Sequence, residues 1–181
     1  IPSPARGVLE VNGKELGRPL LESVEPLASR RDQLAPAKPV QLGAAGAVEL
    51  PLTSAFVLPP MERQPGELAF PAVDASLGGY AAWALESRQE STWYLWAEVI
   101  APDPQSDSMF ISLVDTESSG QLWQECHFRA CKEWSWRPVG LVGKPHAFTI
   151  GAGRSALKLS PREPNLRIRR LLLSPDPGWK P

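Results

Sequence analysis

The segment Thr92-Trp93-Tyr94-Leu95-Trp96-Ala97-Glu98-Val99 alternates between two kinds of side chain. Successive side chains of an extended strand point to opposite faces. One face then carries Trp93, Leu95, Ala97 and Val99, and the other carries Tyr94, Trp96 and Glu98. The first face is expected to lie in a hydrophobic core. The second places a charge beside two aromatic rings, which suits a partly exposed or loop-covered sheet surface and leaves open a binding face.

Short runs of the same kind follow one another from Ala47 to Leu173, separated by Pro, Gly, Asp and Ser. No stretch keeps a helical period. Strands are expected near residues 48–52, 80–85, 92–99, 109–114, 134–139, 147–150, 156–159 and 166–173. This pattern is typical of an all-β fold, a two-sheet antiparallel β-sandwich with almost no helix.

Residues 1–45 differ in composition from the rest of the chain. They contain six prolines and no aromatic residue, whereas all seven tryptophans lie between Trp83 and Trp179. Such a segment buries little apolar surface, so an extended arm or linker is predicted here, and residues 46–181 are assigned to the sandwich. Residues 8–11 alternate well enough to add one strand, to this domain or to another.

Charge and hydropathy argue against several classes of function, among them nucleic-acid binding. Lys and Arg number 19 against 20 Asp and Glu, so the chain has no excess of positive charge for nucleic acid or an anionic membrane surface. No apolar run reaches the roughly 20 residues of a membrane-spanning helix. The chain begins at Ile1 rather than at Met, which a cleaved signal or a cut fragment explains. An extracellular or cell-surface protein is expected.

Cys126 and Cys131 are the only cysteines and lie five positions apart. A tight loop can bridge this spacing, and exported proteins favour disulfides, so a Cys126–Cys131 bridge is predicted. The alternative is a metal site that uses both thiolates and His127. No second pair of ligands at a recognisable spacing supports that alternative.

The order of motifs resembles the carbohydrate-binding-module-like jelly-roll domains, akin to families 6 and 35, of large exported bacterial proteins. The matching segments are Ala75-Ser76-Leu77-Gly78-Gly79-Tyr80, Thr92-Trp93-Tyr94-Leu95-Trp96, Asp107-Ser108-Met109-Phe110, Asp115, Trp134-Ser135-Trp136 and the closing stretch 153–173. The likeness covers more than half of the chain. It implies a jelly-roll sandwich that binds a polysaccharide or another glycan and catalyses nothing.

Three positions depart from that family pattern: Glu98 replaces a frequent Arg, Arg154 a frequent His, and Arg169 a usual Asp. The family often holds a structural Ca²⁺ through a Glu-Ala-Glu-like segment, where this chain has Glu49-Leu50-Pro51. Its acidic residues are dispersed rather than clustered as calcium requires. No cofactor is therefore predicted, and the metal question stays open at this point.

Catalytic motifs are missing from the sequence. A nucleophile–His–acid arrangement would have to use His127 or His146, and no Gly-x-Ser-x-Gly turn accompanies either. Two glycine-rich stretches, at residues 140–144 and 151–155, lack the full spacing of a phosphate loop and a following helix. An enzyme is not expected.

Sugar binding needs flat aromatic rings for the apolar face of a pyranose and a few polar groups for its hydroxyls. The candidates are Trp123, Trp134, Trp136, Glu125, Arg129, Arg162 and Glu163. Trp134 and Trp136 share a face at period two, so they also suit a sandwich core. Trp123 follows Gly120 in a polar stretch and is expected to be partly exposed, whereas Arg162 and Glu163 also suit a structural ion pair.

Two functions follow from these observations. The first is a non-catalytic carbohydrate-binding module of a secreted or cell-surface protein. The second is a structural subunit of a surface layer or filament, in which the N-terminal arm docks on a neighbouring copy or another surface protein. An arm without aromatic residues cannot order itself, so its contacts distinguish the two.

Overall fold

The computed structural model describes residues 38–43, 46–70, 79–115, 123–141 and 143–181, together with the short strands β1 (Glu10–Val11) and β2 (Lys14–Glu15). Residues 8, 9, 75–78 and Gly120, which the sequence analysis used, lie outside the described residues. The chain divides into two units, residues 1–35 and 36–181. In the first unit β1 pairs with β2 in antiparallel fashion.

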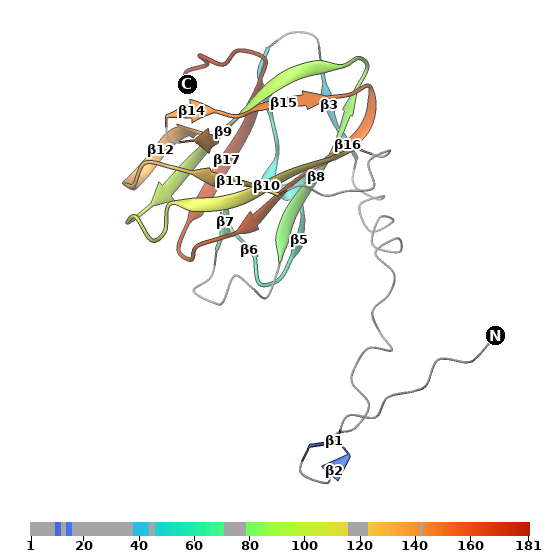
Figure 1. The fold of residues 1–181 in the computed structure, drawn as a ribbon. Helices are drawn as coiled ribbons and strands as arrows, with labels where there is room; N and C mark the ends of the chain where they lie inside the picture. Colours follow the sequence, from blue (N-terminus) through green and yellow to red (C-terminus); the bar gives the residue numbers. More distant parts are fainter. Residues whose placement is uncertain are drawn as a thin grey trace, which may run out of the picture. The chain divides into compact units, whose positions relative to one another are not determined.

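The second unit is built on two sheets (Figure 1). The first sheet runs in the order β11-β10-β16-β8-β3, and β5 also pairs with β8. Its strands are β3 (Val40–Leu42), β5 (Phe56–Leu58), β8 (Tyr80–Ser87), β10 (Ser108–Asp115), β11 (Gln124–His127) and β16 (Gly153–Pro161). All pairings are antiparallel except that of β3 with β8.

The second sheet runs in the order β12-β9-β17-β7-β6, with β15 paired to β9 and β4 paired to β17. Its strands are β4 (Val48–Glu49), β6 (Glu62–Gln64), β7 (Glu67–Ala69), β9 (Ser91–Ala101), β12 (Cys131–Pro138), β15 (Ala147–Ile150) and β17 (Arg167–Ser174). A 3₁₀ turn, η3 (Leu52–Ser54), and a hairpin of β13 (Gly140–Leu141) and β14 (Lys144–Pro145) complete the unit. The predicted sandwich is confirmed, and each predicted strand overlaps an observed one, although the strand predicted at 48–52 covers only Val48–Glu49 and Leu52 belongs to η3.

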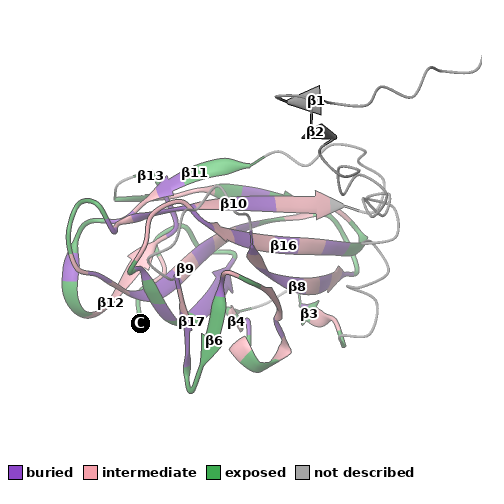
Figure 2. Cartoon of the chain, turned by 90° about the horizontal axis from the view of Figure 1, so that it is seen from below, coloured by how far each residue is buried: buried purple, intermediate pink, exposed green. Residues whose placement is uncertain are grey.

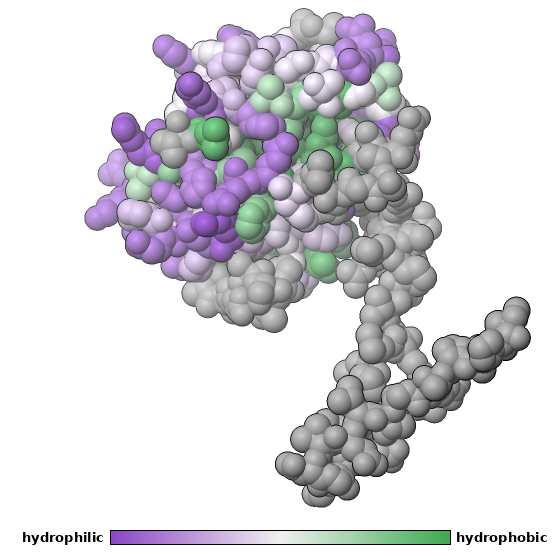
Figure 3. Space-filling view, viewed as in Figure 1, coloured by the Kyte–Doolittle hydropathy of each residue, from purple (hydrophilic) through white to green (hydrophobic). Residues whose placement is uncertain are grey.

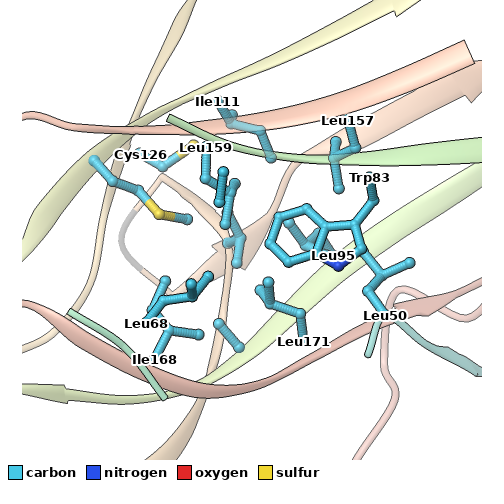
Figure 4. Close-up of a cluster of buried hydrophobic side chains, with 14 of the residues drawn as sticks. Leu50, Leu68, Trp83, Leu95, Ile111, Cys126, Leu157, Leu159, Ile168 and Leu171 are labelled. Carbon is cyan, nitrogen blue, oxygen red and sulfur yellow. The ribbon is translucent and has the colours of Figure 1, made fainter. Parts of the chain in front are cut away.

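The core lies between the sheets, where side chains from both layers point toward one another (Figure 4). The predicted inward face of β9 is confirmed, because all four of its apolar residues are buried. Buried and partly exposed positions also alternate along β16 (Figure 2). Trp83 and Trp93 are enclosed, and each indole N–H donates a hydrogen bond, to the Pro51 carbonyl and the Ser91 hydroxyl respectively.

A β-bulge in β17 places consecutive arginines on one face. The register with β9 shifts between Ile168 and Arg170, so Arg169 is an extra residue. The bulge lets both arginines leave the sheet on its outer side, while Ile168 stays in the core. Arg169 donates a hydrogen bond of 2.5 Å to Glu98 on the neighbouring strand. Two of the three departures from the family pattern are therefore partners of one another.

The predicted disulfide is wrong. Cys126 and Cys131 are both free and buried. Cys126 lies on β11 of the first sheet and Cys131 on β12 of the second, and both belong to the apolar core between the sheets. The Cys126 sulfur lies among these core side chains in Figure 4, and burial, with a smaller contribution from the charge of Glu125, raises its pKa to about 12.

The second unit begins within the segment that composition assigned to an arm. β3 forms a parallel pairing with β8, with Leu42 opposite Ser87. Leu42 is buried, and Val40 packs against the core. The described residues include no helix long and apolar enough to cross a membrane.

Candidate functional site

Edge strand β11 presents the most exposed aromatic ring that the structure describes. Trp123 directly precedes the strand and is 41% exposed, as the sequence analysis expected. Because side chains alternate along a strand, Glu125 and His127 lie on the face opposite to buried Cys126. A large ring, a carboxylate and an imidazole therefore follow one another along the outermost strand of the first sheet.

An ion-pair network joins Glu125 to the end of β16. Arg162 lies between two carboxylates: its Nε is 2.8 Å from Glu125 Oε1, and its Nη1 is 2.8 Å from Glu163 Oε1. The same Nη1 donates to the Ser108 hydroxyl at 2.8 Å. Three of the candidates taken from the sequence thus form one connected group, in which Arg162 and Glu163 pair with each other as well as with other residues.

His127 extends this network. Its Nε2 is 2.7 Å from Glu125 Oε1, and its Nδ1 is 3.8 Å from Asp107 Oδ1. The backbone N–H of Asp107 donates to Glu163 Oε2 at 3.0 Å, so Asp107 connects His127 to Glu163. Each polar side chain of the group is held by at least one other.

Glu163 accepts hydrogen bonds from the Asp107 backbone and the Arg162 side chain. Burial raises its pKa, but hydrogen bonds from the Ser108 hydroxyl and the Asp107 N–H, with the charge of Arg162, outweigh burial and bring the pKa below its usual value. Glu163 is therefore an anion and a hydrogen-bond acceptor at neutral pH.

A pocket of about 390 Å³ opens beside His127. Its lining residues are His127, Phe128, Arg129, Arg137, Pro138 and Gly143. They come from the end of β11, the β11–β12 loop, the end of β12 and the β13–β14 turn, and β11 lies beside β13 (Figure 2). Arg129, another candidate from the sequence, thus lines a pocket next to the network rather than joining it.

Trp134 and Trp136 lie elsewhere, on the outer face of the second sheet. Trp136 pairs in register with Glu98, whose face is opposite to the core face of β9. The guanidinium of Arg169 lies 4.8 Å from the Trp134 ring centroid, and that of Arg167 lies 5.4 Å away. Both tryptophans are half-buried. They are not packed between the sheets as core residues, and arginine side chains contact their rings.

The outer face of β9 is covered by the C-terminal segment. The Trp179 ring lies 5.5 Å from that of Trp96 and 5.0 Å from that of Trp136, centroid to centroid. Contacts of this kind between tilted rings are favourable. For this face of β9 the sequence analysis allowed either a surface covered by a loop or a binding face. In the structure Trp179, which lies after the last strand, contacts the aromatic side chains of this face.

Sequence reasoning did not single out Arg137. Its register partner is Ala97, a fully buried residue of the core face, so the Arg137 side chain leaves β12 on the inner side at the sheet edge. The sequence does contain a signal for Arg137. Alternation along β12 places Arg137 on the same inward face as Ser135, and an arginine is unusual at a core position.

Glu49, in the segment compared with a calcium-binding sequence, accepts hydrogen bonds of 3.1 and 3.2 Å from Arg170. Within the part of the chain that the structure describes, no group of three or more His, Cys, Asp or Glu side chains is arranged to hold a metal ion. The Glu49 carboxylate is thus an ion-pair partner of Arg170 here.

The arrangement of the two sheets is similar to that of several solved structures. A family 35 carbohydrate-binding module from Clostridium thermocellum superposes with a TM-score of 0.52 at 11% identity, over 71% of this chain and 98% of that chain. The fold is that of a carbohydrate-binding-module β-sandwich. The C-terminal family 6 module of the laminarinase LamC from Zobellia galactanivorans gives 0.50 at 11% identity, over 71% and 99% of the two chains.

The same fold occurs as one part of a larger enzyme. The isomalto-dextranase of Arthrobacter globiformis T6, solved with panose, superposes with a TM-score of 0.53 at 11% identity, over 71% of this chain but only 23% of that chain. No family model matches the sequence. A search of curated proteins also found no match.

Proposed function

We propose that this chain is a non-catalytic carbohydrate-binding domain of a secreted or cell-surface protein, and that its ligand lies along β11. The observation that carries the proposal is the exposed ring of Trp123 beside the hydrogen-bonding network of Glu125, Arg162 and Glu163. The fold shared with carbohydrate-binding modules supports it, although fold alone does not determine function.

The chemistry of the surface suits a sugar. An indole ring offers an apolar face to the C–H side of a pyranose, and carboxylates and guanidinium groups accept from and donate to hydroxyls. The network residues already hold one another, so binding needs little further ordering of their side chains. Hydrophilic residues also gather at the edge of the domain that contains β11, β12 and β14 (Figures 1 and 3).

The network does not support glycoside cleavage. A general acid in such a reaction needs a raised pKa so that it is protonated at neutral pH. The hydrogen bonds to Glu163 lower its pKa instead, and Arg162 contacts Glu125 as well. These carboxylates are suited to binding hydroxyl groups.

The test is Trp123→Ala, assayed against a panel of neutral and acidic polysaccharides. We expect a loss of about 1–3 kcal/mol of affinity, the usual scale for an exposed ring buried by a ligand, with an unchanged melting temperature. Trp134→Ala is the matched control, because arginine side chains already cover its ring. If Trp134→Ala abolishes binding and Trp123→Ala does not, the ligand surface lies on the second sheet instead.

A further inference from the structure

The pocket beside β11 differs from the rest of the domain in its balance of charge. Of the six residues that line it, Arg129 and Arg137 are arginines, His127 is a third basic group, and none is a carboxylate. Its volume of about 390 Å³ lies within the range of about 300–1,000 Å³ that is typical of small-ligand pockets.

Four arginines elsewhere on the sandwich form ion pairs with glutamates. Three from β17 each pair with one glutamate, and Arg162 pairs with two. Among the described residues, Arg129 forms no ion pair or hydrogen bond. Among the same described residues, Arg137 donates only to a backbone carbonyl, that of Trp136, at 3.1 Å. The pocket therefore gathers two positive charges that no described carboxylate balances.

Arg137 also has an enclosed donor without an acceptor. Its Nε is buried and has no hydrogen-bond partner among the described residues. A buried donor left unpaired destabilises a folded protein, so such groups usually have an acceptor. Since Arg137 lines the pocket, an anion seated there is well placed to accept from this guanidinium.

We infer that this pocket binds the anionic group of an acidic glycan, a carboxylate or a sulfate ester. The inference rests on the proposed function and deepens it: the ring of Trp123 supplies stacking, and the two arginines select for charge. The overall charge of the chain, −1 at pH 7, provides no general attraction for polyanions, so the selection comes from the local arrangement.

The experiment titrates the full chain with a neutral oligosaccharide, an oligogalacturonate and a sulfated galactan oligosaccharide, by calorimetry. Arg129→Gln and Arg137→Gln are each expected to weaken binding of an acidic ligand by about tenfold or more, and to leave binding of the neutral ligand unchanged. Whichever acidic probe binds more tightly identifies the anionic group. Arg88→Gln is the matched control, because Arg88 is exposed and does not line the pocket.

Arg137→Lys covers the case in which Arg137→Gln fails to fold, since it keeps the charge but loses the planar donor set. It should retain part of the affinity for the acidic ligand. The inference is overturned if acidic ligands bind no more tightly than neutral ones, or if Arg129→Gln binds them like the wild type. If a neutral ligand still binds and its binding depends on Trp123, the proposed function stands although the inference fails. If neither acidic nor neutral ligands bind, the inference and the proposed function are both overturned.

Discussion

Glu98 illustrates how a charged residue is accommodated on the outer face of the second sheet. Only 7% of its surface is exposed, and Arg169 donates to its carboxylate at 2.5 Å. The guanidinium of Arg169 also lies over the Trp134 ring. The hydrogen bond from Arg169 lowers the pKa of Glu98, an effect that burial opposes. This carboxylate therefore stabilises the fold only while it is ionised.

Glu98→Gln should consequently lower the free energy of unfolding in a pH-dependent way. Because the folded pKa lies below the unfolded value of 4.5, the stabilisation is fully present above pH 4.5 and is lost as the pH falls through the folded pKa. At pH 7 we expect the variant to be less stable by about 1–3 kcal/mol, the usual effect of losing a hydrogen bond to a charged group. Urea unfolding of both proteins across this pH range measures the difference.

The control for this measurement is Glu90→Gln, which removes an exposed carboxylate from the β8–β9 turn. Its effect should be small at every pH, because exposed charges contribute little to stability. A Glu98→Gln effect of equal size at pH 3 and pH 7 would contradict the role assigned to the ionised Glu98–Arg169 pair.

The β13–β14 hairpin is the element that supplies one wall of the pocket. The Val139 N–H donates to the Leu95 carbonyl of β9, and the His146 N–H donates to the Val139 carbonyl, so one end of the hairpin is attached to the second sheet and the two ends are attached to each other. A Cβ added at Gly140 would meet backbone atoms of Lys144, Pro145 and His146, all no farther than 3.0 Å. Gly140 is thus required by the close approach of these two backbone segments.

Gly140→Ala should therefore separate the two strands of the hairpin and destabilise the domain by about 1–3 kcal/mol, the usual effect of overpacking. Gly151→Ala is the matched control, because nothing lies within 4 Å of an added Cβ at Gly151. That substitution should leave stability unchanged or slightly raise it, since alanine restricts the unfolded chain. Thermal melting of both variants measures the contrast, and equal melting temperatures would show that the hairpin backbone can yield.

At the scale of the molecule, residues 36–181 contain the whole described core. Every buried apolar residue that the structure describes lies at or after Leu42, and the unit 36–181 is compact by itself. The composition of the chain suggested a boundary near residue 45, whereas β3 pairs with the sheet from Val40 onward. A truncation experiment can determine which of the N-terminal residues the domain needs for its stability.

Removal of residues 1–35 should leave the free energy of unfolding unchanged. Removal of residues 1–45 should lower it by about 2–5 kcal/mol, since it deletes buried Leu42 and its pairing with β8. Urea denaturation of the two truncated proteins and the full chain provides the comparison. If both truncations are equally stable, the boundary lies near residue 45 and β3 contributes nothing.

The sequence by itself determined the β-sandwich and the inward face of its central strand. Alternation is a local property, with a period of two residues, so a run such as residues 92–99 reveals both a strand and its buried side. Strands that are short or have few buried residues carried no such signal. β11 has one buried residue among four, and β3, β6 and β7 have three residues each.

Only the tertiary structure decided which distant side chains meet. Glu98 and Arg169 are 71 positions apart, and their pairing depends on a bulge in β17. Cys126 and Cys131 are close in sequence, yet they lie on strands of opposite sheets as free thiols. The pocket forms where the edges of two sheets meet, and it joins Arg129 to Arg137 there. Sheet edges are brought together by the packing of the whole core, which no local pattern encodes.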